Sequence, residues 1–347
     1  MPPGLKGPPP LRKMILPALF VGGLFYVTFT RTPQAPQQLV IQGEALGTSW
    51  VVKSAEPATD ESKQELRAIV QSALDEVDAQ MSTYRSDSEL MKLNGHKSLD
   101  GTVLSQPLVE ILSEALEIGR LSEGAFDVTI GPAVRAWGFG PEKLHRSPAA
   151  DTIERLAPQL GQDKLRLEQG KAYKAHPELE VDLSAIAKGH AVDLVIERLT
   201  KTGRQNLLAE VGGEIVARGN NPRGEPWRLG IEAPNDEQRS VHQVVALKNA
   251  AMATSGDYRN YYEVDGSRVS HLIDPRSLQP VTNQLASVTV IATRCSTADA
   301  WATALSILGL AAGLEIAERL SLAALFIVRD PELGFVTKTS TAFQQLE

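Results

Sequence analysis

The sequence has little cysteine and no excess of basic residues, and each shortage excludes a class of protein. A single cysteine, Cys295, rules out an intrachain disulfide and any metal site built from several thiolates. The formal net charge of −7 leaves no surplus of basic surface, so we expect no nucleic-acid partner. Apolar residues at 42% and charged residues at 22% match a globular protein with a hydrophobic core.

The N-terminus has the pattern of a targeting segment. Residues 1–13 are rich in Pro and Gly and are basic, and residues 14–30 are uncharged and mostly apolar. That run is intermediate in length between a signal-peptide core and a membrane-spanning helix. Its basic flank favours a cytoplasmic N-terminus. We therefore expect an anchor in the inner (cytoplasmic) membrane, or alternatively a cleaved signal peptide, then a linker over 31–38 and a periplasmic domain over 39–347.

Helical and strand patterns are mixed without a regular βαβ rhythm after the linker, which favours an α+β fold over a doubly wound sheet. Apolar spacing predicts helices from Asp60, with Asp60 as N-cap, over 107–121, from Ser184 and over 296–308. Residues 39–53 have strand character interrupted at Gly47, where the backbone bends or approaches a ligand. Residues 287–292 form another expected strand, and Asp265-Gly266 predicts a hairpin over 261–273.

Asp299 and Thr303 are the clearest pair of candidate ligands. They stand four residues apart on an expected helix and so project from the same face. A carboxylate and a hydroxyl are hard oxygen donors that suit Mg²⁺. Taken alone, the pair is a weak signal. An Asp in the first turn of a helix is more often a cap or dipole partner, and a helical Thr commonly bonds to its own helix.

Five other segments fit either a binding site or ordinary structure. Paired glycines at 212–213 let a ligand approach closely or form a tight turn. Residues 253–258 carry hydroxyls, a glycine and an acid that hold phosphate or cap a helix. His271 fits either of two roles, that of a proton donor or acceptor and that of a structural residue. Residues 124–129 are also consistent with a plain turn into a strand. Residues 182–189 are also consistent with a helix entry in which Ser184 is the N-cap.

Seven segments, in this order, resemble the ApbE family of FAD:protein FMN transferases. They are Met81–Tyr84 with Leu93-Asn94, Gly124–Asp127 with Trp137–Phe139, Val181–Gly189, Val211–Glu214, Ala253–Tyr258, Ser270–Pro275 and Thr297–Thr303. Together they span about residues 40–330. A series of seven ordered motifs is far more specific than any one of them.

The resemblance implies a single α+β domain that binds FAD beside a Mg²⁺ ion. Asp299 and Thr303 would then supply side-chain ligands, and the backbone carbonyl of Ala185 a third. His271 becomes the candidate for accepting or relaying a proton, with Asp257 as the second candidate. The positions that match the flavin-nucleotide site are Tyr84, Ala125, Phe126, Asp127, Lys188, Thr254, Ser255 and His271.

The implied reaction moves FMN from FAD to a Thr or Ser hydroxyl of an acceptor protein and releases AMP. The acceptor would be an exported or membrane-bound electron-transfer subunit. Two departures from the family pattern concern the flavin site: Leu46 stands where Met is frequent, and Lys188 stands where some relatives carry an acid. Two other functions stay open, namely an FAD pyrophosphatase that yields FMN and AMP, and a flavin-binding or scavenging protein without catalysis.

Overall fold

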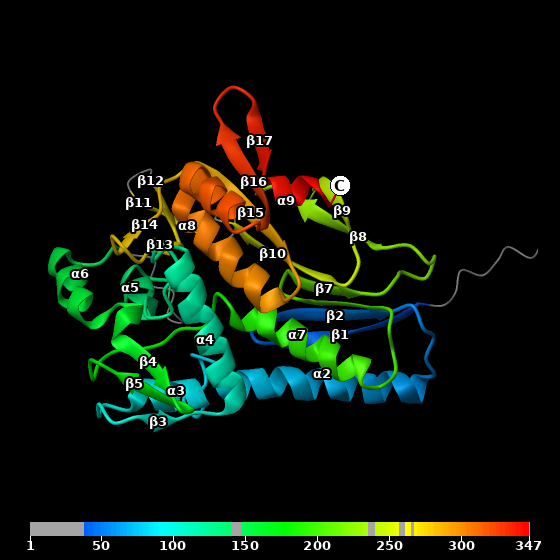
Figure 1. Cartoon of the computed structure of the whole chain (residues 1–347), viewed down its shortest axis with the longest axis horizontal. Helices are drawn as coiled ribbons and strands as arrows, with labels where there is room; N and C mark the ends of the chain where they lie inside the picture. Colours follow the sequence, from blue (N-terminus) through cyan, green and yellow to red (C-terminus); the bar gives the residue numbers. More distant parts are fainter. Residues whose placement is uncertain (1–37, 140–146, 235–239, 257–260, 265–266, 347) are drawn as a thin grey trace, which may run out of the picture. The chain divides into compact units, whose positions relative to one another are not determined.

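The computed structural model describes residues 38–139, 147–234, 240–256, 261–264 and 267–346. The N-terminal tail, the apolar run at 14–30 and almost all of the linker lie outside the described residues, as does Asp257. From Gln38 onward the chain forms a single compact unit. The expectation of an α+β fold is confirmed, because its strands and helices do not alternate regularly (Figure 1).

The centre of this unit is an eight-stranded sheet in the order β1-β2-β6-β7-β10-β15-β16-β17. Every neighbouring pair is antiparallel. The strands are β1 (Leu39–Ala45), β2 (Thr48–Ser54), β6 (Leu207–Val211), β7 (Glu214–Arg218), β10 (Ala250–Gly256), β15 (Leu285–Ala292), β16 (Ala323–Asp330) and β17 (Gly334–Thr339).

Shorter strands form four accessory sheets around the central one. They are β3 (Thr102–Val103) with β5 (Lys171–Lys174) and β4 (Leu165–Glu168), β8 (Trp227–Glu232) with β9 (Val241–Leu247), β11 (Tyr261–Val264) with β12 (Ser267–Ser270), and β13 (Ile273–Asp274) with β14 (Gln279–Pro280). The helices are α2 (Asp60–Met81), α3 (Glu89–Gly95), α4 (Gln106–Leu121), α5 (Gly131–Ala136), α6 (Ala150–Leu156), the 3₁₀ turns η1 (Ala157–Gln159) and η2 (Gln162–Lys164), α7 (Ala187–Thr200), α8 (Cys295–Arg319) and α9 (Thr341–Gln344).

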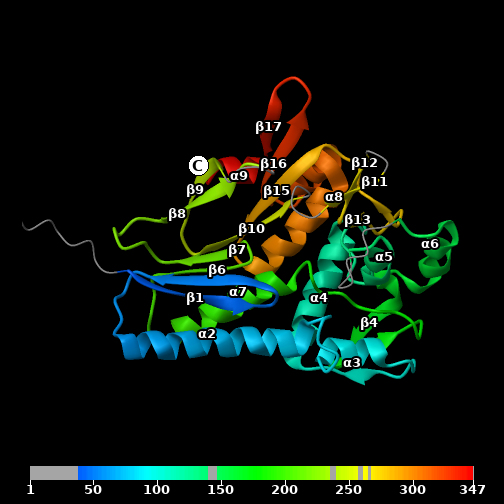
Figure 2. The same cartoon turned by 180° about the vertical axis from the view of Figure 1, so that it is seen from behind.

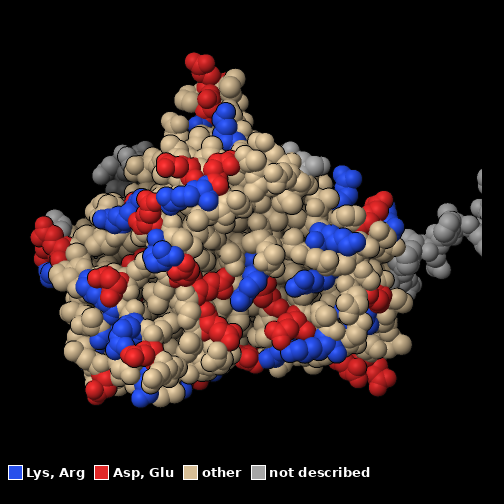
Figure 3. Space-filling view, viewed as in Figure 1, with Lys and Arg blue, Asp and Glu red and all other residues tan. Residues whose placement is uncertain are grey.

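Three long helices cover one face of the central sheet (Figures 1 and 2). α7 packs against β6 and β7, α8 packs against β10 and β15, and α2 packs against α7 and β1. α8 is long and apolar enough to cross a membrane by composition, but most of it is buried against the sheet, so it is a core helix. Basic and acidic side chains are interspersed on the face shown in Figure 3.

The opposite face of the sheet carries a smaller core. Side chains alternate between the two cores along β16, with Ala324 and Phe326 in the larger and Leu325 and Ile327 in the smaller. This alternation follows from the two-residue period of a strand. The smaller core is closed by the β8–β9 hairpin and by Phe343 of α9.

Several sequence-based boundaries are confirmed, and others need correction. α2 begins at Asp60, but its N-cap is Thr59, whose hydroxyl accepts a hydrogen bond from the Ser62 amide at 3.2 Å. α7 begins at Ala187 rather than at Ser184, because the Ser184 amide is bound by the Asp182 carboxylate at 2.9 Å in a separate turn. The first strand segment is a hairpin, since Leu46 and Gly47 adopt left-handed φ values of 53° and 70° and reverse the chain.

In the later part of the chain the expected hairpin is present, and the expected helix is longer than predicted. β11 and β12 form the expected hairpin, with the Asp265-Gly266 turn itself outside the described residues. α8 continues to Arg319 across a break at Gly309, where φ is 77° and ψ is 175°. Asn283 donates its side-chain amide to the Ser306 carbonyl at 2.9 Å just before this break. A carbonyl near the interruption is thus satisfied by a side chain from outside the helix.

Truncation of Phe343 is expected to destabilise the protein strongly, because this side chain lies in the smaller core. Phe343 is fully buried, so Phe343→Ala is expected to lower the free energy of unfolding by about 3–5 kcal/mol in urea denaturation. Leu346→Ala is the matched control, because Leu346 is 44% exposed and its loss should change stability by about 0.5 kcal/mol at most. Equal effects of the two substitutions would show that α9 does not close this core.

Candidate active site

The candidate site is built where the first turns of α7 and α8 come into contact. Gly189 lies in the first turn of α7, and a Cβ atom on it would stand 2.3 Å from the Cys295 carbonyl oxygen at the start of α8. That separation is far below a van der Waals contact, and the obstacle is backbone. Only glycine permits this approach.

Asp299 uses this contact to reach across to α7. Its Oδ2 atom accepts a hydrogen bond from the Gly189 amide at 3.1 Å, and the residue is only 6% exposed. The Gly189 amide would otherwise bond to the carbonyl of Ala185, four residues earlier, in the helical manner. In the described part of the chain the Ala185 oxygen accepts no backbone hydrogen bond. The carboxylate therefore leaves this carbonyl available to a ligand.

Thr303 stands one turn beyond Asp299 on α8. Ser306 donates its hydroxyl to the Ala302 carbonyl of its own helix, as is common, whereas the Thr303 hydroxyl makes no hydrogen bond with any described residue. The Thr303 hydroxyl thus makes no hydrogen bond to its own helix, although such a bond is the usual role of a helical threonine.

The donors present at this point fit Mg²⁺. A carboxylate, a hydroxyl and a backbone carbonyl, from Asp299, Thr303 and Ala185, are oxygen ligands of the kind that Mg²⁺ takes while keeping water or phosphate in its other positions. No cluster of three or more His, Cys, Asp or Glu suited to a metal occurs among the described residues. The fit consequently depends on one carboxylate combined with neutral oxygens.

Two further charged side chains flank Asp299. The Lys188 ammonium lies 2.9 Å from Glu214 Oε1 and 3.5 Å from Asp299 Oδ2. Burial raises the pKa of Glu214 to about 7, and the Asp299 charge adds to this shift while Lys188 opposes it. Burial acts to lower the pKa of Lys188, but Asp299 and Glu214 outweigh it and leave that pKa above its ordinary value. Lys188 is therefore a fixed positive charge beside the candidate ligands.

Two tight turns border this cluster. The paired glycines form the β6–β7 turn, with φ of 64° at Gly212 and 108° at Gly213, so the turn interpretation of this motif is confirmed. The Gly212 amide donates to the Ser49 carbonyl at 3.0 Å, next to the Leu46–Gly47 turn of the first hairpin. Glu214 begins β7 directly after the glycines and is thereby directed toward Lys188.

The Gly124–Asp127 motif lies at the other end of the site and is held from within. Ala125 and Phe126 are buried, so their side chains serve the core. The Asp127 carboxylate accepts hydrogen bonds from the amide and hydroxyl of Thr129, both at 2.7 Å, and from the Gln162 amide at 3.0 Å. Burial nevertheless raises the pKa of Asp127. Asp127 thus fixes the shape of this loop, and the amides of Ala125 and Phe126 are bonded to the carbonyl and the hydroxyl of Ser122.

His271 belongs to an aromatic group that single-residue patterns do not indicate. The Phe139 ring lies edge-on to His271 with centroids 6.3 Å apart, and 5.0 Å from the Tyr262 ring. The Tyr262 hydroxyl donates to the Trp137 carbonyl at 3.0 Å. The Trp137–Phe139 motif and His271 are far apart in sequence, and the fold brings them together. No sequence motif singles out Tyr262, which is indicated only by its place in the expected hairpin.

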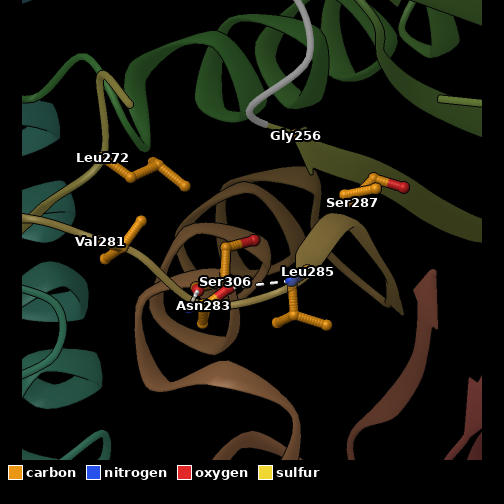
Figure 4. A pocket seen from close by; sticks show the side chains of 8 residues that line it. Gly256, Leu272, Val281, Asn283, Leu285, Ser287 and Ser306 are labelled. Carbon is orange, nitrogen blue, oxygen red and sulfur yellow. Dashed lines mark hydrogen bonds between the residues drawn. The ribbon is translucent and has the colours of Figure 1, made fainter. Parts of the chain in front are cut away.

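Thr254 and Ser255 lie on β10, whose last residue, Gly256, lines a small cavity. The Thr254 hydroxyl is 2.8 Å from that of Thr289, so part of its hydrogen bonding is used within the sheet. Figure 4 shows Leu272 and Val281 on one side of Ser306 and Ser287 on the other. The Ser287 hydroxyl is buried and has no hydrogen-bond partner among the described residues. The cavity is lined by Gly256, Leu272, Val281, Asn283, Leu285, Ala286, Ser287 and Ser306.

One face of α8 connects the two ends of the site. Asp299, Thr303 and Ile307 follow one another at four-residue spacing and so share this face. Ile307 packs against Ala125 and Leu272, the neighbour of His271. At 1.5 Å per residue, Asp299 and Ile307 are separated by roughly 12 Å along the helix.

Tyr84 follows α2 and is 74% exposed. Within the described part of the chain, no side-chain hydrogen bond or ion pair joins Tyr84 to the Asp299 cluster, and Asp257 lies outside that part. The structure thus brings together Ala185, Lys188, Asp299 and Thr303 at one end of α8, and Ala125 and His271 at the other.

Comparison with known proteins places this geometry in a family. The model of the ApbE family matches residues 46–326. An FAD:protein FMN transferase of Haemophilus influenzae is 41% identical over 318 residues, covering 88% of this chain and 90% of the relative. A solved flavin transferase ApbE from Vibrio cholerae superposes with a TM-score of 0.82 at 38% identity and covers 90% of this chain and 99% of that one.

A second solved structure agrees with the first. The flavinyl transferase ApbE of Pseudomonas stutzeri has a TM-score of 0.81 at 39% identity, covering 89% of this chain and 96% of that one. The chain belongs to the ApbE family.

A methyl group added at Gly189 tests the close contact between α7 and α8. Gly189→Ala would force the Cys295 carbonyl away, and overpacking of this kind typically costs about 1–3 kcal/mol. We expect that loss in urea unfolding, together with weaker Mg²⁺ binding by calorimetry. Gly95→Ala is the control, because a Cβ there has nothing within 4 Å. A Gly189→Ala protein as stable as the unsubstituted chain would contradict the close approach.

Proposed function

We propose that this chain transfers FMN from FAD to a Thr or Ser hydroxyl of an acceptor protein, with Mg²⁺ bound at Asp299, Thr303 and the Ala185 carbonyl. Relatives that are 37–41% identical over most of their length are named FAD:protein FMN transferases. The observation that carries the metal assignment is the Ala185 carbonyl, which loses its helical partner to Asp299.

The buried charges support a site for phosphates. Mg²⁺ held by Asp299, Thr303 and the Ala185 carbonyl would supply positive charge against the negative charge that develops on the pyrophosphate. Lys188 adds a second positive charge, and Glu214 holds its ammonium in place at 2.9 Å. A lysine fixed beside a carboxylate is suited to contact phosphate as a point charge.

In the proposed step, the acceptor hydroxyl oxygen forms a bond to the FMN-side phosphorus of FAD. The bond from this phosphorus to the bridging oxygen breaks, and AMP leaves with that oxygen. The hydroxyl proton passes to the His271 ring, with Asp257 as the second candidate. Since a neutral hydroxyl is a poor nucleophile, in-line placement by the protein must supply much of the rate.

The acceptor is proposed to be an exported or membrane-bound electron-transfer subunit. Leu46 and the exposed Tyr84 ring are the proposed contacts with the flavin ring of FAD. Leu46 covers a ring face with apolar atoms but without the polarisable sulfur of Met, so flavin binding should persist with a changed contact.

Replacement of the single carboxylate at the metal site tests this proposal. Asp299→Asn should slow Mg²⁺-dependent flavin transfer by roughly 100-fold or more, because a bound metal contributes several kcal/mol to such a step. Asp75→Asn, at an exposed position on α2, is the matched control and should leave the rate unchanged. The assay is in-gel flavin fluorescence of the acceptor after incubation with FAD and Mg²⁺.

The products of the same incubation separate the three functions. Fluorescent acceptor together with AMP supports transfer. Free FMN with an unlabelled acceptor indicates a pyrophosphatase, and intact bound FAD indicates storage. An Asp299→Asn protein that transfers flavin at the unsubstituted rate would overturn the metal assignment.

We also propose that residues 14–30 anchor the protein in the inner membrane, with the domain on the periplasmic side. Support comes from the uncharged run and its basic flank. The paired substitutions Leu19→Arg and Val27→Arg should abolish recovery of the protein in the membrane fraction, since each charge near the bilayer centre costs about 2.5–3.5 kcal/mol. Protease added to spheroplasts should digest the anchored domain. A protease-resistant domain would place it in the cytoplasm instead.

A further inference from the structure

The start of α8 is capped by a residue from another helix. Arg294 occupies the N-cap position and makes no capping hydrogen bond with its side chain. The carboxylate of Asp193 on α7 takes over this role. Its Oδ1 accepts from the Cys295 amide at 2.9 Å, and its Oδ2 accepts from the Ser296 amide at 3.1 Å. Two of the amides left unpaired at a helix start are thereby satisfied from 102 and 103 residues away.

A second carboxylate holds the same turn from α4. Both oxygens of Glu114 lie 3.1 Å from the Ser296 hydroxyl, and Oε1 accepts from the Thr297 hydroxyl at 2.5 Å. Arg294 lies 3.5 Å from Glu114 and 3.8 Å from Asp193 and so links the two acids. Three helices are fixed to one another at the first turn of α8.

The bonds between α7 and α8 are reciprocal. α7 donates its Gly189 amide to Asp299 on α8, and α8 donates two amides to Asp193 on α7. Gly189 and Asp193 are one turn apart on the same face of α7. With a bond in each direction, α8 can neither slide nor rotate against α7 without breaking one of them. This fixes the Asp299 carboxylate relative to the Ala185 carbonyl.

We propose that Asp193, supported by Glu114, is a positioning residue that sets the affinity of the Asp299 site for a divalent cation. The proposal rests on the proposed function, since it assumes that the cation binds there. Mg²⁺ tolerates little departure from octahedral geometry, so ligands on two helices must be held in register. Residues that orient ligands in this way typically affect metal affinity about 10–100-fold.

The cysteine at the first position of α8 provides a local probe. Cys295 is fully buried, and its thiol faces the carbonyls of Ile215 and Met252 at 3.6 and 3.9 Å. A thiol reagent can modify it only when the start of α8 moves away. Because the chain holds no other cysteine, the labelling rate with Ellman's reagent reports on this turn alone.

The test compares Asp193→Asn with Glu197→Gln in the full chain in detergent. Glu197 lies one turn further along α7 and is exposed, paired with Lys201. We expect Asp193→Asn to raise the Mg²⁺ dissociation constant by about 10–100-fold in calorimetry and to accelerate Cys295 labelling by a similar factor. Saturating Mg²⁺ should slow this labelling again, because the cation binds only the closed arrangement. Glu197→Gln should change neither quantity.

A purely structural cap would give a different result. In that case Asp193→Asn would lower the unfolding temperature while the Mg²⁺ dissociation constant stayed at the unsubstituted value, and the proposal would be overturned. Glu114→Gln supplies the same comparison if Asp193→Asn does not fold. An unsubstituted chain that binds no Mg²⁺ would instead refute the proposed metal-dependent function, independently of how fast Cys295 is labelled.

Discussion

The site depends on how closely the first turns of α7 and α8 approach each other. The absence of a side chain at Gly189 lets the Cys295 backbone come within a distance that any Cβ would prevent. Only at this separation can Asp299 accept the Gly189 amide, and only because it does so is the Ala185 carbonyl left without a helical partner. A steric property of one residue thus leaves a buried carboxylate and a carbonyl without a helical partner at the contact of the two helices.

Burial of charge around this contact is better explained by function than by stability. Lys188, Glu214 and Asp299 form a compact group in which one positive charge neutralises two acids only in part. Removing such charges from water costs several kcal/mol per ion, and their mutual attraction seldom returns more than that. The raised pKa of Glu214, about 7, is a direct sign of this cost. Buried charged groups that perturb one another's pKa values in this way are typical of functional sites.

The sequence predicts what local patterns determine and fails where distant residues decide. Four-residue spacing placed Asp299 and Thr303 on a common face, and apolar periodicity located α2 and α4. The sequence could not show that Leu46 adopts a left-handed φ, which turns one expected strand into a hairpin. The Lys188–Glu214 pair joins elements 26 residues apart in the chain, and no pattern links them. The cap of α8 was equally hidden, since it comes from Asp193 on another helix.

The length of α8 accounts for the spacing of the remaining motifs. Because Asp299, Thr303 and Ile307 share one face, the cluster at the start of the helix and the Ala125–Leu272 contact near His271 are held at a fixed separation. The helix is interrupted at Gly309, just beyond Ile307, where Asn283 satisfies the Ser306 carbonyl. Its first segment therefore ends where the contact with the His271 loop is complete. A rigid element of this length, fixed at its start by two carboxylates, positions groups more accurately than loops alone would.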